Sequence, residues 1–409
     1  MKILYLHQYF STRAGTAPTR SYEFARHLVS LGHQVTVVTG LSERTRIGDW
    51  AGASRRPIKR GLIEGIDVVV VGVRYSNEMG YLRRMVSFTM FMLLATWAGL
   101  RVGKLDLVFA TSTPLTIGIP GYVISRLRRV SFVFEVRDLW PAAPIAVGAL
   151  RNRILIGLAK WLERFLYESA SRVIVLSPDA RDILIRQGVA EEKLRLIPNC
   201  ADLDLFKPDI ESSFRGENDL KDRFVCLYTG AMGMANGLDI IMRTAHLLRE
   251  NGEVIFVLVG EGREKARLIA MKDRLQLENV LFPEPNPRSE IPGIVSAADL
   301  CLLVFKPLKI FETTSPNKLF DYLAAGKPVL TNLGGWIKEL LDGSGAGVSV
   351  RPDDALEMAA QISWLKDNGD VLRQMGINAR DLAIKEFDRS RLASEFEEAL
   401  LECVPSGRA

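Results

Sequence analysis

The sequence predicts an α/β protein with two domains, each a doubly wound parallel sheet with helices on both faces. Three observations support this class. The chain has 409 residues, enough for two or three domains of about 100–200 residues each. Short apolar runs alternate with helical patterns in both halves. A polar stretch at residues 202–223 interrupts this alternation near the middle of the chain.

The first half opens with a β-α-β pattern, in which residues 3–6 and 34–38 are strands and residues 21–31 form the helix between them. Further apolar runs predict strands at 68–71, 107–110, 132–136 and 172–176. The segments between them are long enough for crossover helices, so we expect the strands to pair in parallel.

The second half repeats this alternation. Its apolar runs predict strands at 225–229, 255–260, 280–282, 300–304, 328–331 and 347–350. A helical pattern follows from about residue 370. We therefore expect an N-terminal domain at 1–205, a linker at 206–223, a C-terminal domain at 224–385, and a terminal helix at 386–409 that packs across both domains.

The charge is unevenly distributed. Residues 1–150 carry 19 Lys and Arg against 9 Asp and Glu, a balance of +10, so the remainder carries −5 of the total of +5. This asymmetry points to an anionic partner for the first half, either phosphorylated substrates or an acidic membrane. Nucleic acid is disfavoured, because the basic clusters lack interleaved aromatic residues and any recognisable reading module.

Cysteine and histidine usage argues against a metal site. Cys200, Cys226, Cys301 and Cys403 are far apart and form no Cys-x-x-Cys pair, so they are typical of reduced cytosolic thiols. The four histidines show no metal-ligand spacing. The N-terminus reads as a first strand with no secretion signal, so we expect a cytoplasmic protein.

One segment, residues 85–100, is apolar throughout, with Arg83 and Arg84 before it and Arg101 and Lys104 after it. It is too short for a membrane span, which needs about 20 residues. Two interpretations remain open: a buried crossover helix, or an interfacial helix whose basic flanks contact anionic lipid.

The most informative motif lies at residues 311–329. Ser315 is expected to cap a helix, Pro316 to occupy its first position, and Gly326 to end it. A helix start that follows a strand in a doubly wound fold is a site for anions such as phosphate. Lys318 would add positive charge, and Asp321 could accept hydrogen bonds from ribose hydroxyls. A capped surface helix would explain the same residues.

This motif, together with residues 32–35, 198–202, 228–230 and 260–262, resembles glycosyltransferase family 4 over residues 2–387. The resemblance implies the GT-B fold, two Rossmann-like domains facing across a cleft. Residues 315–320 and 135–141 are similar to bacterial enzymes of the WbuB type that build surface polysaccharides. Those enzymes imply a UDP-linked N-acetylated amino sugar as the donor and no further cofactor.

The donor site departs from the family pattern of two glutamates seven residues apart, whose places are taken here by Thr313 and Asp321. Glu312 is one residue early and is a candidate catalytic residue only if the loop shifts. The cations that the family places after the first strand of the second domain are absent from residues 231–237. Lys318 is therefore our first choice for the diphosphate, with backbone N–H groups and Arg263 as alternatives. The full set of expected nucleotide-sugar contacts is Gly15, Thr16, Gly230, Gly233, Arg263, Thr313, Ser315, Asn317, Lys318 and Asp321.

In the N-terminal half, Gly15 and Thr16 occupy the place of the family's glycine-rich loop, although an ordinary βα turn would also need Gly15. Arg137 or Asp138 stands where the family often has a histidine that contacts the sugar, and the match is uncertain by one residue. Both are candidate catalytic residues, with a surface ion pair as the alternative.

The resemblance implies a retaining, metal-independent transferase. Its partners would be a nucleotide-sugar donor and a lipid-linked saccharide acceptor at the inner face of the cell membrane. Asp202-Leu203-Asp204 matches a metal-binding Asp-x-Asp, but it falls at the linker and is discounted. The alternatives are an epimerase or phosphorylase of the same fold, and a non-catalytic scaffold at the membrane.

Overall fold

The computed structural model describes residues 1–15, 18–42, 47–48, 58–75, 79–284 and 289–404. The chain forms two compact units. The N-terminal unit contains Met1–Pro198 and Ser390–Ala409, and the C-terminal unit contains Asn199–Arg389.

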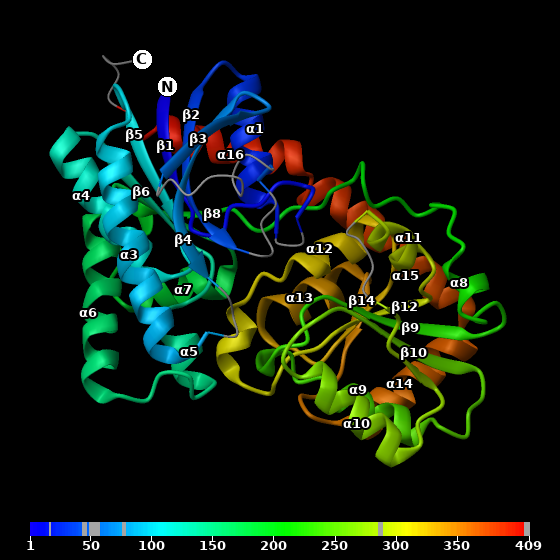
Figure 1. Cartoon of the computed structure of the whole chain (residues 1–409). Coiled ribbons are helices and arrows are strands. Elements are labelled where there is room, and N and C mark those ends of the chain that lie inside the picture. The colour runs from blue at the N-terminus through cyan, green and yellow to red at the C-terminus, as the bar shows by residue number, and fades with distance from the viewer. Residues whose placement is uncertain (16–17, 43–46, 49–57, 76–78, 285–288, 405–409) are drawn as a thin grey trace. The chain divides into compact units, whose positions relative to one another are not determined.

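The N-terminal unit is built on an eight-stranded sheet of order β3-β4-β2-β1-β5-β6-β7-β8 (Figure 1). All neighbouring strands are parallel except β3, which pairs antiparallel with β4. The strands are β1 (Lys2–Leu6), β2 (Gln34–Ser42), β3 (Ile58–Ile63), β4 (Ile66–Tyr75), β5 (Leu107–Thr111), β6 (Ser131–Val136), β7 (Arg172–Val175) and β8 (Leu194–Leu196). The six strands expected in this half are present, and β3 and β8 are additional.

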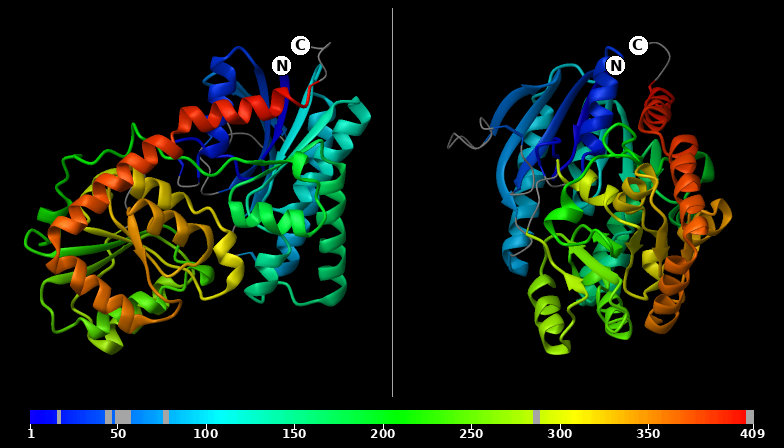
Figure 2. Two further views of the ribbon diagram at one scale, coloured as in Figure 1. Left: turned by 180° about the vertical axis from the view of Figure 1, so that it is seen from behind. Right: turned by 90° about the vertical axis from the view of Figure 1, so that its right-hand side faces the viewer.

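Helices cover both faces of this sheet. They are α1 (Arg20–Ser30), α3 (Tyr81–Leu100), α4 (Gly118–Arg128), α5 (Ala142–Ala146), α6 (Arg153–Ser169), α7 (Pro178–Arg186) and α16 (Arg389–Leu401), with short 3₁₀ turns η1 (Leu115–Ile117) and η2 (Glu191–Lys193). α4 packs against α3 on one side and α6 on the other, so these three helices form one layer (Figure 1). On α16, Phe396 packs against Phe24 of α1 and Phe109 of β5 at ring-centroid distances of 4.9 and 5.0 Å. The red ribbon of α16 runs beside the blue N-terminal elements (Figure 2).

The C-terminal unit has a six-stranded parallel sheet of order β11-β10-β9-β12-β13-β14. Its strands are β9 (Phe224–Thr229), β10 (Val254–Val259), β11 (Val280–Leu281), β12 (Leu300–Leu303), β13 (Val329–Thr331) and β14 (Gly347–Ser349). Its helices are α8 (Phe214–Glu217), α9 (Asp239–Leu247), α10 (Lys265–Leu275), α11 (Ile291–Ser296), α12 (Asn317–Ala324), α13 (Gly335–Ser344), α14 (Ala355–Asp367) and α15 (Gly369–Glu386), with 3₁₀ turns η3 (Met234–Asn236) and η4 (Lys309–Thr313). All six strands expected in this half are present.

The central strands are apolar because helices cover both of their faces. Every residue of β5 and of β10 is buried. The two units are therefore doubly wound α/β domains, as the sequence predicts.

The units meet in the sequence at 198/199 and 389/390, whereas the sequence analysis places a linker at 206–223. Residues 199–205 belong to the C-terminal unit because they bind there: Asn199 contacts Ser315, Ala201 forms a bridge with Asp388, and Asp202 pairs with Arg389. The helical tail is two helices. α15 belongs to the C-terminal unit, and nearly all of α16 belongs to the N-terminal unit.

Candidate functional site

Each sheet has a point at which successive connections leave in opposite directions. In the C-terminal unit this point lies between β9 and β12, because β9 leads to β10 on one side and β12 leads to β13 on the other. In the N-terminal unit it lies between β1 and β5. Ligands of doubly wound folds bind at the carboxyl ends of the strands at such points.

The expected motif lies at the C-terminal switch point. α12 begins at Asn317, just after the loop that follows β12. The predicted helix end is confirmed, since Gly326 follows it with φ of +63°. The predicted cap is wrong: Pro316, with extended backbone angles, precedes the first turn. Ser315 instead receives a hydrogen bond on its hydroxyl from the N–H of Asn199, 3.3 Å away.

Lys318 is the most unusual group in this region. Its Nζ is inaccessible to solvent and has no hydrogen-bond partner among the described residues. It lies 3.7 Å from the ring centroid of Tyr228, at the end of β9. Burial lowers the pKa of Lys318 to about 7, although the charge of Asp321, one turn along α12, opposes this shift. A buried cation whose hydrogen-bond donors are unused fits an anionic ligand.

The glycines after β9 and β10 serve different purposes. Gly230 has φ of +121°, and a Cβ there would lie 3.2 Å from Cε and Nζ of Lys318. Gly260 and Gly262 are required by packing, because a Cβ at Gly260 would lie 1.9 Å from the carbonyl oxygen of Gly230, and one at Gly262 would lie 2.4 Å from that of Met232. This packing holds the loop after β9 at the sheet edge.

The other expected donor-site residues are divided between the segment at the start of α12 and the loops after β9 and β10. Asn317 is the first residue of α12 and is partly exposed. Thr313 is buried, and its hydroxyl donates to the carbonyl oxygen of Ile310 at 2.7 Å. Gly233 has an ordinary φ of −99°. Arg263 is exposed in the loop after β10, and no contact connects its side chain with Lys318.

Glu312 lies at the start of another helix. Its Oε1 would be 2.9 Å from a Cβ built on Gly334, which precedes α13. The adjacent Trp336 of α13 donates from Nε1 to the carbonyl oxygen of Thr314 at 2.9 Å. These contacts place η4, which contains Glu312, against the start of α13.

The N-terminal switch point carries a buried ionic cluster. Arg20 on α1 and Glu135 on β6 form a salt bridge of 2.9 Å, and both side chains are almost completely buried. Arg137 approaches the other carboxylate oxygen of Glu135 at 3.3 Å. Burial raises the pKa of Glu135, but Arg20 and Arg137 outweigh it, so the pKa lies below its usual value. Glu135 therefore stays ionised, and Arg137 keeps its position at the end of β6.

The expected site residues of the N-terminal unit differ in how far they are buried. Arg137 is mostly buried, whereas Asp138 is exposed. Gly15 is buried and closes a turn with Thr12 through a backbone hydrogen bond of 3.1 Å. Thr16 lies outside the described residues.

Five residues that the sequence analysis did not assign to the site contribute to these two edges. They are His7, Arg20, Glu135, Asn199 and Tyr228. His7 follows β1 directly, and its pKa is well below the usual value because of burial and the nearby Arg137. Its Nδ1 is buried with no partner among the described residues. Position at the carboxyl end of a strand at the switch point was the available signal for His7 and Tyr228.

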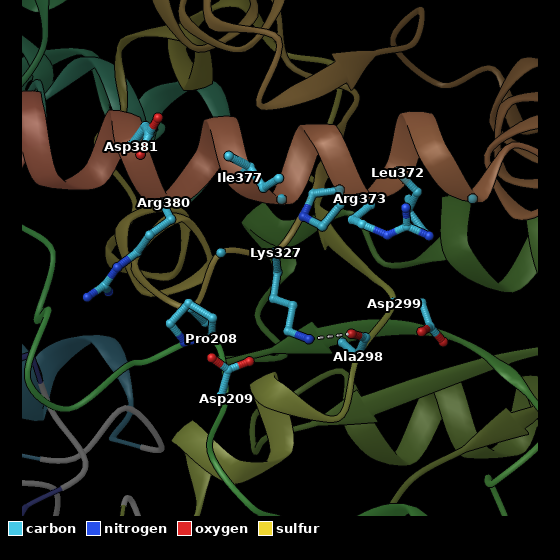
Figure 3. Close-up of a pocket in the computed structure, with 15 residues that line it drawn as sticks. Pro208, Asp209, Ala298, Asp299, Lys327, Leu372, Arg373, Ile377, Arg380 and Asp381 are labelled. Atoms are coloured by element: carbon cyan, nitrogen blue, oxygen red, sulfur yellow. Dashed lines mark hydrogen bonds between the residues drawn. The ribbon is translucent and has the colours of Figure 1, made fainter.

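The cavity shown in Figure 3 has a volume of about 510 Å³ and lies at the opposite edge of the C-terminal sheet, by the residues that precede β12 and β13. Several of its polar groups already bind the protein. Lys327 donates from Nζ to the carbonyl oxygens of Ser296 and Ala298 at 2.6 and 2.9 Å. Asp299 accepts from Arg215 at 2.6 Å. The edge that carries Lys318 is therefore the better candidate site for an anionic ligand.

The described ranges lack the features of a metal site and of a membrane span. No group of three or more His, Cys, Asp or Glu side chains there is arranged to hold a metal ion. None of the helices in the described part of the chain has the length and apolarity needed to cross a bilayer.

Two family models match the chain. Residues 15–200 match the glycosyl transferase 4-like domain, and residues 223–368 match the glycosyl transferases group 1. The putative colanic acid biosynthesis glycosyl transferase WcaI of Escherichia coli (strain K12) is 24% identical over 91% of this chain and 93% of its own length.

Two further proteins are similar. A UDP-Gal:alpha-D-GlcNAc-diphosphoundecaprenol alpha-1,3-galactosyltransferase of Escherichia coli is 26% identical over 54% of this chain and 59% of its own length. The crystal structure of Anabaena HepE in complex with UDP-glucose superimposes with a TM-score of 0.72 at 18% identity, covering 98% of this chain and 100% of that one. The last likeness concerns the fold.

Proposed function

Since the chain belongs to glycosyltransferase family 4 and has the two-domain GT-B fold of that family, we propose that it transfers a sugar from a UDP-sugar to a lipid-linked saccharide. The product would be part of a bacterial surface polysaccharide. The similarity to a colanic acid transferase supports the pathway, and the similarity to a galactosyltransferase named for UDP-Gal and a diphosphoundecaprenol acceptor supports both substrates.

One observation carries the donor assignment: Nζ of Lys318 is buried, has no hydrogen-bond partner among the described residues, and lies beside the start of α12. The first N–H groups of a helix lack intrahelical partners and favour negative charge. A diphosphate bound there would receive both a cation and these N–H groups. Asp321 on the same helix is the proposed partner of the ribose hydroxyls.

In the proposed reaction, the bond between the anomeric carbon and the diphosphate oxygen breaks as the acceptor hydroxyl attacks that carbon. The UDP leaves with two additional electrons on its oxygen, and the protein stabilises this charge through Lys318 and the start of α12. The proton of the acceptor hydroxyl leaves with the departing phosphate. We propose that the configuration at the anomeric carbon is retained and that no metal ion takes part in the reaction. Catalytic roles for Arg137, Asp138 and Glu312 remain predictions.

The proposed acceptor has a lipid tail and would stay in the membrane. α3 supports contact with that membrane, because the large apolar side chains Val86, Met90, Leu93 and Trp97 are exposed along it. The segment is thus a crossover helix with one apolar face left open, and peripheral attachment at the inner face of the cell membrane is proposed from that face.

The decisive experiment combines binding and transfer. Thermal unfolding with UDP-, GDP- and dTDP-sugars should show stabilisation by a UDP-sugar. Lys318→Ala should abolish this stabilisation, whereas Lys309→Ala, an exposed lysine in the preceding 3₁₀ turn, should preserve it. Asp321→Ala should raise the KM for the donor at least tenfold.

Product analysis with a labelled UDP-sugar and polyprenyl-diphosphate-linked saccharides then identifies the reaction. Appearance of the label in the lipid fraction supports transfer. An epimerised UDP-sugar, or UDP binding with no labelled lipid from any acceptor, would contradict the proposed function.

A further inference from the structure

α6 carries a second exposed apolar stripe, which is not evident from the sequence as a surface feature. Ile154, Leu158 and Trp161 are spaced by four and three residues and therefore lie on one side of the helix. They are 75, 57 and 63% exposed. Phe165 continues the stripe one turn further and stacks against Trp161 with ring centroids 5.5 Å apart. Apolar side chains of this size are normally covered.

The stripes on α3 and α6 face away from the same sheet. On α3 the residues opposite the exposed stripe, Phe91, Ala95 and Ala98, are buried, and on α6 the same is true of Leu166 and Tyr167. α4 lies between the two helices and contacts both. Tyr122 of α4 packs against α6, because its ring meets that of Phe165 edge to face with the ring centroids 4.7 Å apart. We call the exposed stripes of α3 and α6 the two-helix face.

The charge around the two-helix face is predominantly positive. α3 and α4 contain no acidic residue, and the only exposed acid on α6 is Glu168, which pairs with Arg164 at 2.7 Å. The exposed basic residues on and beside the three helices are Arg83, Arg101, Lys104, Arg126, Arg129, Arg151, Arg153, Lys160 and Arg164. Arg101 also stacks on Trp97, 3.4 Å from the ring centroid.

We propose that the two-helix face is a docking surface for an anionic lipid bilayer, with α6 as well as α3 in contact with it. Large apolar side chains between Lys and Arg are the pattern of helices that lie at a membrane interface, and tryptophan prefers the headgroup region. A second copy of the chain fits this face poorly, because a two-fold interface would bring basic residues against basic residues. The proposal rests on the proposed function in one respect, since a lipid-linked acceptor is reached only at a membrane.

Vesicle co-sedimentation of the full chain tests the surface. Binding should be strong to vesicles of phosphatidylglycerol and phosphatidylcholine and weak to phosphatidylcholine alone, and it should fall as salt is raised. Leu158→Glu with Trp161→Glu should weaken binding to anionic vesicles at least tenfold. The matched control is Leu356→Glu with Trp364→Glu, which changes the same residue types at exposed positions of α14 in the other unit and should leave binding unchanged.

Two further variants separate apolar from ionic contact. Arg153→Gln with Lys160→Gln should reduce the salt dependence while leaving the fold intact, as circular dichroism would show. In wild type the fluorescence of Trp161 should shift to the blue on anionic vesicles and be quenched by brominated lipid, and Trp161→Phe should remove that part of the signal.

Three results would overturn the proposal: no binding of wild type to anionic vesicles, wild-type binding by the α6 variant, or a dimer in solution that the α6 variant dissociates. Stabilisation of the same variants by a UDP-sugar is measured in parallel. If vesicle binding fails while UDP-sugar binding persists, only the docking surface is wrong. If vesicle binding persists without any sugar transfer, the proposed function is wrong.

Discussion

Lys318 illustrates how a single side chain ties donor binding to pH. Its ammonium is buried against Tyr228, and burial lowers its pKa to about 7 from an ordinary 10.5. Above pH 7 the free protein therefore holds the residue largely neutral, and a bound diphosphate must draw a proton onto it. Nucleotide-sugar binding should be accompanied by proton uptake in this range.

The resulting prediction concerns the pH profile of donor binding. The Kd for the UDP-sugar should rise by roughly tenfold or more between pH 7 and pH 9, because each unit of pH above the pKa removes most of the remaining charged form. Isothermal titration in buffers of different ionisation enthalpy would measure both the affinity and the proton uptake. Lys318→Met should bind weakly with a flat profile, and a wild-type profile that is equally flat would contradict the role of Lys318.

Lys318 also makes folding stability depend on pH, and in the opposite direction to donor binding. The unfolded chain binds more protons than the folded chain between about pH 7 and pH 10, so stability should rise with pH across this window in the absence of ligand. The cost of burying Lys318 is thus greatest below pH 7, where donor binding is strongest.

The buried pair of Arg20 and Glu135 yields a second prediction. Arg20→Ala removes the cation from a carboxylate that is fully buried, and it should lower the free energy of unfolding by about 3–5 kcal/mol. Urea denaturation would measure the change. Arg60→Ala, which breaks the exposed pair with Asp67, is the control and should cost less than about 1 kcal/mol. Equal losses in the free energy of unfolding for the two substitutions would contradict a larger contribution from the buried pair.

These residues mark how far a sequence can specify a site. Lys318 and Asp321 stand in a motif on one helix, so their neighbourhood was predictable from local spacing. Arg20 and Glu135 are 115 positions apart and meet only through the order of strands in the sheet. Neither position carries a local signal of that contact. Ser315 was misjudged as a cap because its partner, Asn199, lies 116 positions away.

At the scale of elements, Asn199 holds the loop before α12. Its side chain is buried, its amide donates to the carbonyl oxygen of Ser315, and its N–H donates to the hydroxyl of the same residue. Two hydrogen bonds thus fix the loop immediately before the proposed phosphate-binding helix start.

Asn199→Ala should therefore raise the KM for the donor about fivefold with a smaller change in kcat, since it removes the amide hydrogen bond, worth about 1 kcal/mol, and keeps the backbone one. Steady-state kinetics with varied UDP-sugar would measure both constants. Asn368→Ala, which removes an amide that binds only the preceding helix end, should change neither constant. A loss confined to kcat would contradict a role in placing the donor.

Glycines in the loops and helices of the C-terminal unit should respond oppositely to alanine. Gly260→Ala should destabilise the protein by several kcal/mol, because the new Cβ would collide with the carbonyl of Gly230 at a φ of +151°. Gly343→Ala lies in α13 with open space around it and should stabilise by about 0.5–1 kcal/mol. Thermal unfolding of the two variants would measure both changes. A small effect of Gly260→Ala would contradict the close packing of Gly260 against Gly230.

The elements themselves were largely predictable. All twelve expected strands are present, because strands covered on both faces leave continuous apolar runs in the sequence. β3 and β8 were missed because charged residues interrupt the apolar pattern: Lys59 and Arg60 in β3, and Arg195 in β8, which has only three residues. The apolar pattern also located α3. The sequence could not predict which side of α3 is exposed, because that depends on how the helix packs against the sheet and α4.

At the scale of the whole molecule, the N-terminal unit is made from both ends of the chain. α16 belongs to it, and Phe396 is completely buried between Phe24 and Phe109. The C-terminal unit is a continuous segment, Asn199–Arg389, inserted between these two parts.

Truncation after Arg389 should therefore destabilise the N-terminal unit and spare the C-terminal one. Removing a buried phenylalanine alone costs about 3–5 kcal/mol, and the deletion removes the rest of α16 as well. Differential scanning calorimetry and limited proteolysis would assign the loss to a unit. Truncation after Val404 keeps α16 and should leave both units stable. Unfolding of the C-terminal unit by truncation after Arg389 would contradict this division.

The route of the chain through its two units has a consequence for synthesis in the cell. A ribosome that adds about 5–20 residues per second would complete the first 198 residues and then need roughly 10–40 s for the inserted segment before α16 emerges. During that interval Phe24 and Phe109 have no cover from α16, and the first unit to be translated is the last to be finished. Nascent chains of this protein should therefore engage chaperones through the N-terminal sheet until α16 has been made.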